Sequence, residues 1–468
     1  MEVPYIKLFK ANKSFYVYDV NTNIICKISE ESYRILSDRI SKKNTETYFC
    51  SSEEVERMEN LGLLKPNKIL GIGNKIAENK KEILGNEVSS LLLQITRNCN
   101  LRCKYCFYSG NYENIRTHSE SYLDWSVAKQ AIDFLNAHSS NKNDISIGFY
   151  GGEPLLNFSM IKKCVDYANH LFLNKNIEYS ITTNGVLLKN EIADFLINHN
   201  FKINISVDGP KNVHDKNRIF INNHGSYDII IDNLKCLKEK NSDFYKKYVR
   251  YNAVYTGEFS ERDIKDYFKY SMLFKDLKGK LSPLNNYHKN SISLNNKFNS
   301  VNKTNRGVEK LFSMYNIIKG NMVCCDESLE TLYGISDKLT YQYIECEKLM
   351  TSSGLCFPGI SKLFCTIKGD LYICEKVNDN SEECKIGDIF SGFDMNKIDI
   401  LLSMGNKTKT GCKNCWAIRL CNMCQAKMVN FSAKDFAWRC DYLRKQILIN
   451  LKDICTLNSQ NINIDEYK

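Results

Sequence analysis

The chain has 468 residues, 43% of them hydrophobic and 25% charged, and its 64 Lys and Arg exceed its 54 Asp and Glu to give a formal charge of +10. This composition excludes a disordered or collagenous chain, and the length predicts about three domains. The longest apolar runs are far shorter than the ~18 residues that span a bilayer, and the N-terminus lacks the pattern of a secretory signal. We therefore expect a cytoplasmic protein with no membrane span. Its mild positive charge forms no dense basic patch, so nucleic acid is not an expected partner.

The first 64 residues predict a small unit of strands followed by helices. Three short β-prone runs, with turn residues between them, cover 5–9, 14–19 and 24–28. Ser29 is placed to cap a first helix, and Ser51 or Ser52 a second helix that ends at Gly62. Residues 65–88 are polar, rich in Lys and Asn and weakly periodic, which predicts a linker.

From Ser89 to about Lys280, strands alternate with amphipathic helices. The predicted strands are 91–95, 145–149, 177–181, 203–207 and 248–254. The predicted helices between them include 123–137, 158–173, 190–198 and 226–239. This alternation predicts the α/β class, with parallel βα units that close fully or partly into a barrel. Residues 283–306 predict an exposed insertion rich in Asn and Ser, residues 307–350 are largely helical in pattern, and two Gly-containing hairpin-like stretches follow.

Cysteine is the main chemical signal, with 20 residues in the chain. Disulfides are rare in a reducing cytosol, so metal or redox chemistry is the better interpretation. Half of the cysteines lie between Cys346 and Cys440, and three more lie close together at Cys99, Cys103 and Cys106. A structural framework would spread its cysteines more evenly.

The strongest motif is the loop from Cys99 to Cys106, which has C-x3-C-x2-C spacing and directly follows the strand predicted at 91–95. Thiolates are soft ligands that suit iron–sulfur clusters. Three of them, Cys99, Cys103 and Cys106, can hold three irons of a [4Fe–4S] cluster and leave the fourth iron open. The alternative is a zinc site that lacks one ligand, although structural zinc prefers four.

With Tyr105 before its last cysteine, this loop resembles the signature of the radical S-adenosylmethionine (SAM) superfamily. Three further motifs resemble those of the superfamily, each at the end of a predicted strand: Gly151-Gly152-Glu153-Pro154, Thr183-Asn184-Gly185 and Ser206-Val207-Asp208-Gly209-Pro210. The resemblance implies a SAM site with the Gly151–Pro154 run at the amino group, Asn184, Ser206 and Asp208 near the ribose and carboxylate, and Arg218 on the carboxylate. The glycines would let the backbone approach a ligand closely.

The same resemblance implies a reaction. In this superfamily the open iron binds the amino and carboxylate groups of SAM, and one electron from the reduced cluster breaks the bond between sulfur and C5′. The products are methionine and a 5′-deoxyadenosyl radical, which abstracts a hydrogen atom from the substrate. The cofactor carries the difficult chemistry, and the protein positions and shields it.

The C-terminal cysteines resemble the SPASM extension of radical SAM peptide-modifying enzymes, which holds two auxiliary [4Fe–4S] clusters. The resemblance assigns the distal cluster to Cys412, Cys415, Cys421 and Cys440, and the proximal cluster to Cys356, Cys374 and Cys424. The spacing before Cys424 is one residue shorter than the family pattern. Cys365 and Cys346 are candidates for a fourth proximal ligand, and an open site for a substrate thiolate is the other possibility. A zinc ribbon is the alternative for the run from Cys412 to Cys424.

The N-terminal unit resembles the winged-helix-like recognition element of enzymes that modify ribosomally made peptides. Such a domain binds a leader peptide as an added strand at its sheet edge, where backbone groups are unpaired. The alternative is a small domain that stabilises the barrel or a dimer. If the unit is a separate recognition domain, deletion of residues 1–64 should weaken peptide binding and spare uncoupled SAM cleavage.

Together these features predict a radical SAM enzyme that joins a Cys sulfur to a carbon atom in a precursor peptide, as in sactipeptides or ranthipeptides. Its reductant would be of the flavodoxin or ferredoxin type. The alternatives are carbon–carbon cross-linking, epimerisation, anaerobic sulfatase maturation to formylglycine, or a metal-binding scaffold that docks peptides without turnover. The predicted domains are a recognition element at 1–64, a linker at 65–88, a radical SAM core with a partial (β/α)6 barrel at 89–310, a bridging region at 311–355 and a SPASM domain at 356–455.

Overall fold

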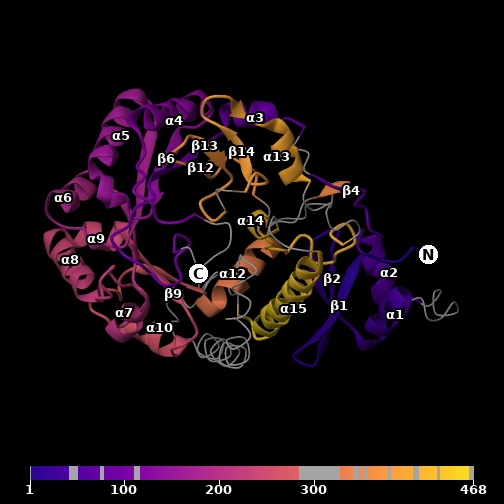
Figure 1. Ribbon diagram of the computed structural model, residues 1–468. Coiled ribbons are helices and arrows are strands. Elements are labelled where there is room, and N and C mark those ends of the chain that lie inside the picture. Colours follow the sequence, from indigo (N-terminus) through magenta and orange to yellow (C-terminus); the bar gives the residue numbers. More distant parts are fainter. Residues whose placement is uncertain are drawn as a thin grey trace. The chain divides into compact units, whose positions relative to one another are not determined.

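The computed structural model describes residues 2–41, 51–73, 78–109, 116–283, 327–340, 347–350, 354, 356–377, 381–403, 411–428 and 433–462. The chain forms two compact units (Figure 1). The first unit comprises Met1–Glu78, Lys303–Cys356 and Leu402–Lys468, and the second comprises Asn79–Asn302 and Phe357–Leu401. The predicted insertion from 284 onward and Cys346 lie outside the described residues.

The second unit is built on a ten-stranded sheet with the order β10-β9-β8-β7-β6-β5-β12-β13-β14-β15. Strands β5 to β10 pair in parallel in chain order. Their bounds are Ser90–Thr96, Asp144–Gly151, Asn176–Thr183, Lys202–Ser206, Val249–Tyr255 and Lys278–Pro283. These six strands, with helices between them, confirm the predicted α/β class with parallel βα units.

Four short strands extend this sheet beyond β5. Strand β12 (Leu363–Cys365) pairs in parallel with β5, and antiparallel pairing then adds β13 (Asp370–Tyr372), β14 (Lys385–Asp388) and β15 (Gly392–Phe393). The hairpin-like stretches expected after Cys356 are therefore present, but they continue the sheet of the second unit. The sequence pattern gave no indication of this pairing, because β12 lies more than 250 residues after β5.

Helices follow the strands of the second unit and lie along their outer side in Figure 1. The helices predicted from periodicity are present as α4 (Trp125–Ala137), α5 (Phe158–Leu171), α6 (Asn190–Asn198) and α8 (Tyr227–Lys240). The side chain of Asp124 accepts a hydrogen bond from the Ser126 backbone and caps α4, whose buried stripe includes Ala128, Ile132 and Leu135. Additional helices are α3 (Lys80–Asn86), α7 (Lys211–Asn217), α9 (Ser242–Tyr248), α10 (Glu261–Tyr270) and α13 (Met395–Leu402).

The first unit begins with the three predicted strands, β1 (Ile6–Ala11), β2 (Ser14–Asp19) and β3 (Ile24–Ile28), in an antiparallel sheet. Helices α1 (Glu30–Ser41) and α2 (Glu53–Asn60) follow, and Ser52 caps α2 by accepting a hydrogen bond from Val55. One face of the sheet packs on these helices through a core that includes Val17, Leu36 and Val55. The predicted order of strands and helices is confirmed, and the winged-helix likeness stays a prediction.

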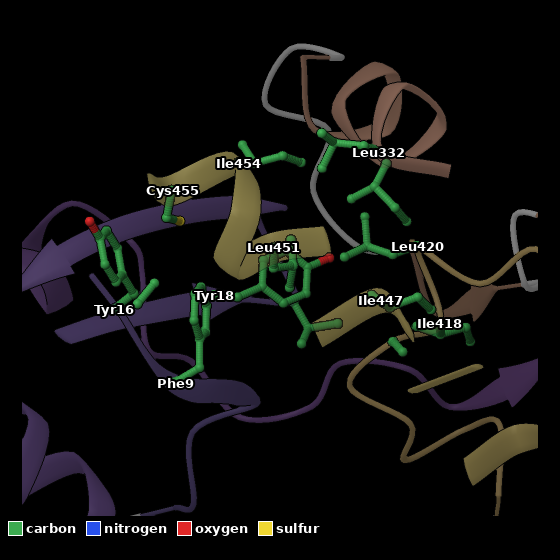
Figure 2. Packing of buried hydrophobic residues seen from close by; sticks show 14 of the residues in the cluster. Phe9, Tyr16, Tyr18, Leu332, Ile418, Leu420, Ile447, Leu451, Ile454 and Cys455 are labelled. Carbon is green, nitrogen blue, oxygen red and sulfur yellow. The ribbon is translucent and has the colours of Figure 1, made fainter. Parts of the chain in front are cut away.

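The opposite face of this small sheet is also buried. It packs against α12 (Glu327–Thr340) and the long α15 (Ala433–Asn458) through a core formed by Phe9, Tyr16, Tyr18, Leu332, Ile335, Ile447, Leu451 and Ile454 among others (Figure 2). A short α14 (Gln425–Met428) and the two-stranded pairing of β4 (Gly71–Ile72) with β11 (Leu349–Met350) complete the unit. The N-terminal sheet is therefore the middle layer of a larger unit.

The structure groups the segments differently from the five predicted domains. Residues 65–88, expected to be a linker, contain β4 and α3, and Leu84 of α3 is buried. The expected SPASM segment 356–455 is divided, because 357–401 belongs with the parallel sheet and the part from Leu402 onward belongs with the N-terminal sheet. Among the described residues, no helix has both the length and the apolar character needed to cross a membrane.

Candidate functional site

The three clustered cysteines lie on the loop that leaves the C-terminal end of β5. The loop is anchored to the segment after α7, because Arg102 N donates to Ile219 O (2.7 Å) and Lys104 N to Asn217 O (3.1 Å). A bond from Cys106 N to Cys103 O (3.1 Å) turns the chain between the last two thiols. Parallel strands place reactive groups at this end of a barrel.

The residues Cys99, Cys103 and Cys106 are half-buried, and their thiols interact electrostatically with one another. Burial raises the pKa of all three, to about 12 for Cys103, and the nearby Arg218 guanidinium acts in the opposite direction on Cys103 and Cys106. Electrostatic interactions with Glu153 and with the other two thiols raise the pKa of Cys99 further. Cationic iron would favour the thiolate forms, since a coordinating thiol is deprotonated by its metal. This donor set fits an iron–sulfur cluster.

Gly151 and Gly152 let two backbone segments touch at the end of β6. A Cβ atom would lie 2.3 Å from Thr96 O at Gly151, which has φ 143°, and 2.1 Å from Asn98 O at Gly152. Gly152 N donates to Thr96 O (2.9 Å) and Glu153 N to Asn98 O (2.8 Å). These glycines were expected to let a ligand approach the backbone. They are also required for the direct contact between the end of β6 and the cysteine-bearing loop.

The Glu153 carboxylate is buried and joins the ends of β6 and β7. Its Oε1 accepts hydrogen bonds from Thr183 Oγ1 (2.7 Å) and Leu155 N (3.1 Å), and its Oε2 accepts from Asn184 N (2.7 Å). Pro154, the next residue, begins a 3-10 helix (Pro154–Asn157). Burial raises the pKa of Glu153 to about 7, although these donors lower it. The Gly151–Pro154 motif thus contains a carboxylate that is bound by donors of the protein itself.

Glu153→Gln should lower the free energy of unfolding. The new amide N–H group would face N–H or O–H donors that now bind a carboxylate oxygen of Glu153. We expect a loss on the order of 1–3 kcal/mol. Since the pKa of Glu153 is raised from 4.5 to about 7 in the fold, the wild-type carboxyl stabilises most below its unfolded pKa and loses that contribution as the pH rises to about 7. Thermal midpoints at several pH values would test this, with Glu120→Gln, an exposed carboxylate, as the control. A wild-type advantage that does not change with pH would contradict it.

Asn184 connects this carboxylate to the cysteine loop. Its side-chain Nδ2 lies 2.8 Å from Asn100 Oδ1 and 3.8 Å from Cys99 Sγ, and its Oδ1 accepts from Val186 N (3.0 Å). Glu153 therefore fixes the backbone of a residue whose amide meets a thiol sulfur. Hydrogen bonds to cluster sulfurs are one of the levers that set a cluster's reduction potential.

Arg218 is buried beside the second thiol. Its Nη1 lies 3.9 Å from Cys103 Sγ, its guanidinium lies 5.4 Å from the Tyr105 ring centroid, and its Nε lies 3.0 Å from Asp208 Oδ1. Asp208 also accepts hydrogen bonds from the Tyr105 hydroxyl and from Val254 N (2.9 Å). The resemblance to the superfamily predicted that Asp208 and Arg218 each contact the cofactor. In the structure they form an ion pair with each other.

The structure thus brings together most of the residues that the motifs singled out. Contacts and electrostatic interactions join ten of them near the ends of β5 to β8 and of α7: Cys99, Cys103, Tyr105, Cys106, Gly151, Gly152, Glu153, Asn184, Asp208 and Arg218. Ser206 ends β8 opposite Asn252 of β9, and its role stays a prediction. His214 was missed as a supporting residue: its Nδ1 accepts from Asp208 N (3.4 Å) and its Nε2 meets Ser226 Oγ (3.0 Å). The sequence signal that could have identified His214 is its position four residues before Arg218.

The C-terminal cysteines form a second group within the first unit. Burial raises the pKa of Cys440 to about 12, and electrostatic interactions with Cys412, Cys421 and Cys415 add to this effect. These are the four residues expected at the distal cluster. Arg444 Nη1 lies 3.9 Å from Cys415 Sγ, and Met423 N donates to Cys421 Sγ (3.4 Å).

The expected proximal ligands are distributed over both units. Cys356 and Cys424 belong to the first unit and Cys374 to the second, so their joint role stays a prediction. Cys365 is fully buried in β12, with its Sγ 3.6 Å from Thr366 O. In the part of the chain that the structure describes, no three His, Cys, Asp or Glu side chains are grouped to hold a metal ion. This absence applies to sites for a single metal ion. In an iron–sulfur cluster each thiolate binds a different iron, so the thiolates need not converge on one point.

The radical SAM superfamily profile matches residues 93–270. The chain is 45% identical over 104 residues to an uncharacterized protein of Methanocaldococcus jannaschii, covering 22% of this chain and 33% of that protein. It is 28% identical over 211 residues to the radical SAM cyclopropyl synthase TigE of Paramaledivibacter caminithermalis (40% and 44%). It is 31% identical over 116 residues to a cysteine-type anaerobic sulfatase-maturating enzyme of Clostridium perfringens (23% and 30%). The chain thus spans less than half the length of these curated relatives.

A solved structure of similar fold is that of native anSMEcpe with bound AdoMet and the Cp18Cys peptide. It superimposes with a TM-score of 0.55 at 22% sequence identity, and covers 78% of this chain and 98% of that one. At this identity the likeness concerns the fold.

Proposed function

We propose that the chain is a radical SAM enzyme whose catalytic cluster is held by Cys99, Cys103 and Cys106, because the radical SAM superfamily profile matches residues 93–270 around this loop. The observation that carries the proposal is the half-buried group of three thiols on the loop after β5, with a guanidinium and an amide directed at two of their sulfur atoms. When bound there, a cluster and SAM would supply one-electron cleavage of SAM and abstraction of a hydrogen atom from the substrate.

The surrounding residues would position the cofactor and keep water out. Asp208 orients Arg218, whose guanidinium suits the SAM carboxylate. Glu153 fixes Asn184 beside Cys99, and the backbone of Gly151 and Gly152 forms the adjoining wall. Burial raises the pKa of Tyr105 well above its ordinary value, which keeps its hydroxyl neutral as the donor to Asp208.

We further propose that Cys412, Cys415, Cys421 and Cys440 hold one auxiliary cluster, and that Cys356, Cys374 and Cys424 contribute to another. The interaction of Cys440 with the other three thiols supports the first assignment. Anaerobic reconstitution should give about twelve irons per chain for three clusters. Cys421→Ala should lose about four of them and keep SAM cleavage without substrate. An iron content equal to that of the unsubstituted protein would contradict the auxiliary assignment.

The proposed substrate is a Cys-containing precursor peptide, and the proposed product is a thioether from a Cys sulfur to carbon. An edge of the N-terminal sheet supports peptide recognition, because β3 is an outer strand of mostly exposed or half-buried residues, with Ile24 exposed. A peptide strand could pair there through its backbone. A reduced flavodoxin or ferredoxin would supply the electron.

Maturation of a sulfatase Cys to formylglycine is the second candidate, and the similarity to a cysteine-type anaerobic sulfatase-maturating enzyme favours it. Mass spectrometry separates the two products. A thioether keeps the sulfur and removes two hydrogen atoms per link, whereas formylglycine formation removes the sulfur. The test needs a Cys-containing precursor peptide and a Cys-containing sulfatase peptide, each incubated with reconstituted enzyme, SAM and dithionite.

A further inference from the structure

The loop that carries Cys412, Cys415 and Cys421, here called the cysteine loop, is hydrogen-bonded to the N-terminal sheet. Tyr5 directly precedes β1, and its hydroxyl donates to Cys415 O (2.7 Å). In the opposite direction, Arg419 Nη1 from the loop donates to Asn21 O (2.9 Å), in the turn between β2 and β3. These two contacts join segments about 400 residues apart in the chain.

Other residues of the first unit hold the same loop by its backbone. Asn67 Nδ2 donates to Lys413 O (2.9 Å). Lys338 Nζ, from α12, donates to Cys421 O (3.1 Å) and lies 3.4 Å from Leu420 O. Side chains from outside the loop therefore hold the backbone carbonyl groups of Lys413, Leu420 and Cys421.

Apolar contacts reinforce these bonds. The loop residues Ala417, Ile418 and Leu420 are buried in the same core as Tyr18 of β2 and Leu451 of α15 (Figure 2). The Trp416 ring meets the Tyr18 ring edge-on at 6.5 Å, and Lys7 Nζ lies 5.5 Å from its centroid. The loop thus has a buried apolar side as well as fixed carbonyls.

Both the backbone carbonyl and the sulfur of Cys415 have a side-chain partner. Tyr5 binds its carbonyl, and Arg444 of α15 lies at its sulfur. A thiolate ligand keeps its geometry only if the residues around it fix the backbone and the sulfur, which is the role of outer-shell partners at metal sites.

We propose that the N-terminal sheet is the support of the auxiliary cluster, with Tyr5 and Arg419 as positioning residues that hold the cysteine loop in its ligating conformation. The inference rests on the proposed cluster at Cys412, Cys415, Cys421 and Cys440. It gives the N-terminal sheet a role that does not depend on peptide binding.

Tyr5→Phe tests this, because it removes one hydroxyl and keeps the ring. Tyr16→Phe is the matched control: Tyr16 is a buried tyrosine of the neighbouring strand β2, and its hydroxyl interacts with Ser14. In the reconstituted 468-residue chain, Tyr5→Phe should release about four irons to bathophenanthroline disulfonate roughly fivefold faster than the control, as the loss of one hydrogen bond implies. Visible circular dichroism of the cluster should also change in Tyr5→Phe and not in Tyr16→Phe. Arg419→Met, which removes a separate contact, should give the same two effects.

The outcomes distinguish this proposal from the cluster assignment. If Cys421→Ala loses about four irons but Tyr5→Phe and Arg419→Met match Tyr16→Phe in release rate and spectrum, the supporting role is refuted and the cluster stands. If Cys421→Ala retains all its iron, the cluster assignment fails, and the supporting role fails with it.

Discussion

Cys103→Ala should abolish formation of 5′-deoxyadenosine from SAM and remove about four irons from the reconstituted protein. The physical reason is that a site with three thiolates has no ligand to spare, because the fourth iron must stay open for SAM. Cys103 is also the thiol beside Arg218, so its loss removes an iron ligand and leaves the proposed carboxylate-binding guanidinium without its sulfur neighbour. Anaerobic assays with dithionite as reductant would measure both quantities.

Cys236→Ala is the matched control, since Cys236 is an exposed thiol on α8 of the same unit. It should keep its iron and its rate of SAM cleavage. Retained 5′-deoxyadenosine formation in Cys103→Ala, or equal iron contents in the two variants, would remove the basis for the proposed enzyme. A zinc content near one per chain in place of iron would favour the zinc alternative.

Sequence periodicity predicted β5 to β9 and four of the helices between them to within two residues. These elements have strong local signals: strands with near-continuous apolar residues, as in a sheet covered on both faces, and helices with an apolar stripe. The strand-end positions of Asn184 and of the loop that begins at Cys99 also anticipated that these two residues would lie together, because parallel strands end at the same edge. The position of Arg218 was expected only from the resemblance to the superfamily.

The partners of the buried polar groups could not be predicted in this way. Glu153 and Asp208 looked like cofactor ligands, but each accepts hydrogen bonds from protein donors on neighbouring strands. Such hydrogen bonds depend on how side chains of different strands and loops are placed in space. The spacing of residues along the sequence does not reveal them. The pairing of β12 with β5 and the contact of Tyr5 with Cys415 are long-range in the same sense.

The burial of both faces of the N-terminal sheet changes the expected result of deleting residues 1–64. As a separate recognition domain, this segment could be removed without loss of SAM cleavage. In the structure it contributes Phe9, Tyr16 and Tyr18 to the core shared with α12 and α15 (Figure 2). Removing one buried aromatic side chain costs about 3–5 kcal/mol, and whole domains are stable by only about 5–15 kcal/mol. The deletion should therefore unfold the first unit.

We expect the deleted protein to aggregate, or to lack the iron of the auxiliary cluster because Tyr5 and the Arg419 acceptors are gone. Thermal unfolding and iron analysis would show this, with Tyr18→Ala as a graded version, since Tyr18 is fully buried and its hydroxyl donates to Asn23 Oδ1 (2.7 Å). Peptide recognition is better tested by Ile24→Asp on the exposed strand β3, which leaves this core in place. A deleted protein that stays folded with its full iron content would mean that α12, α15 and the cysteine loop are stable without the sheet.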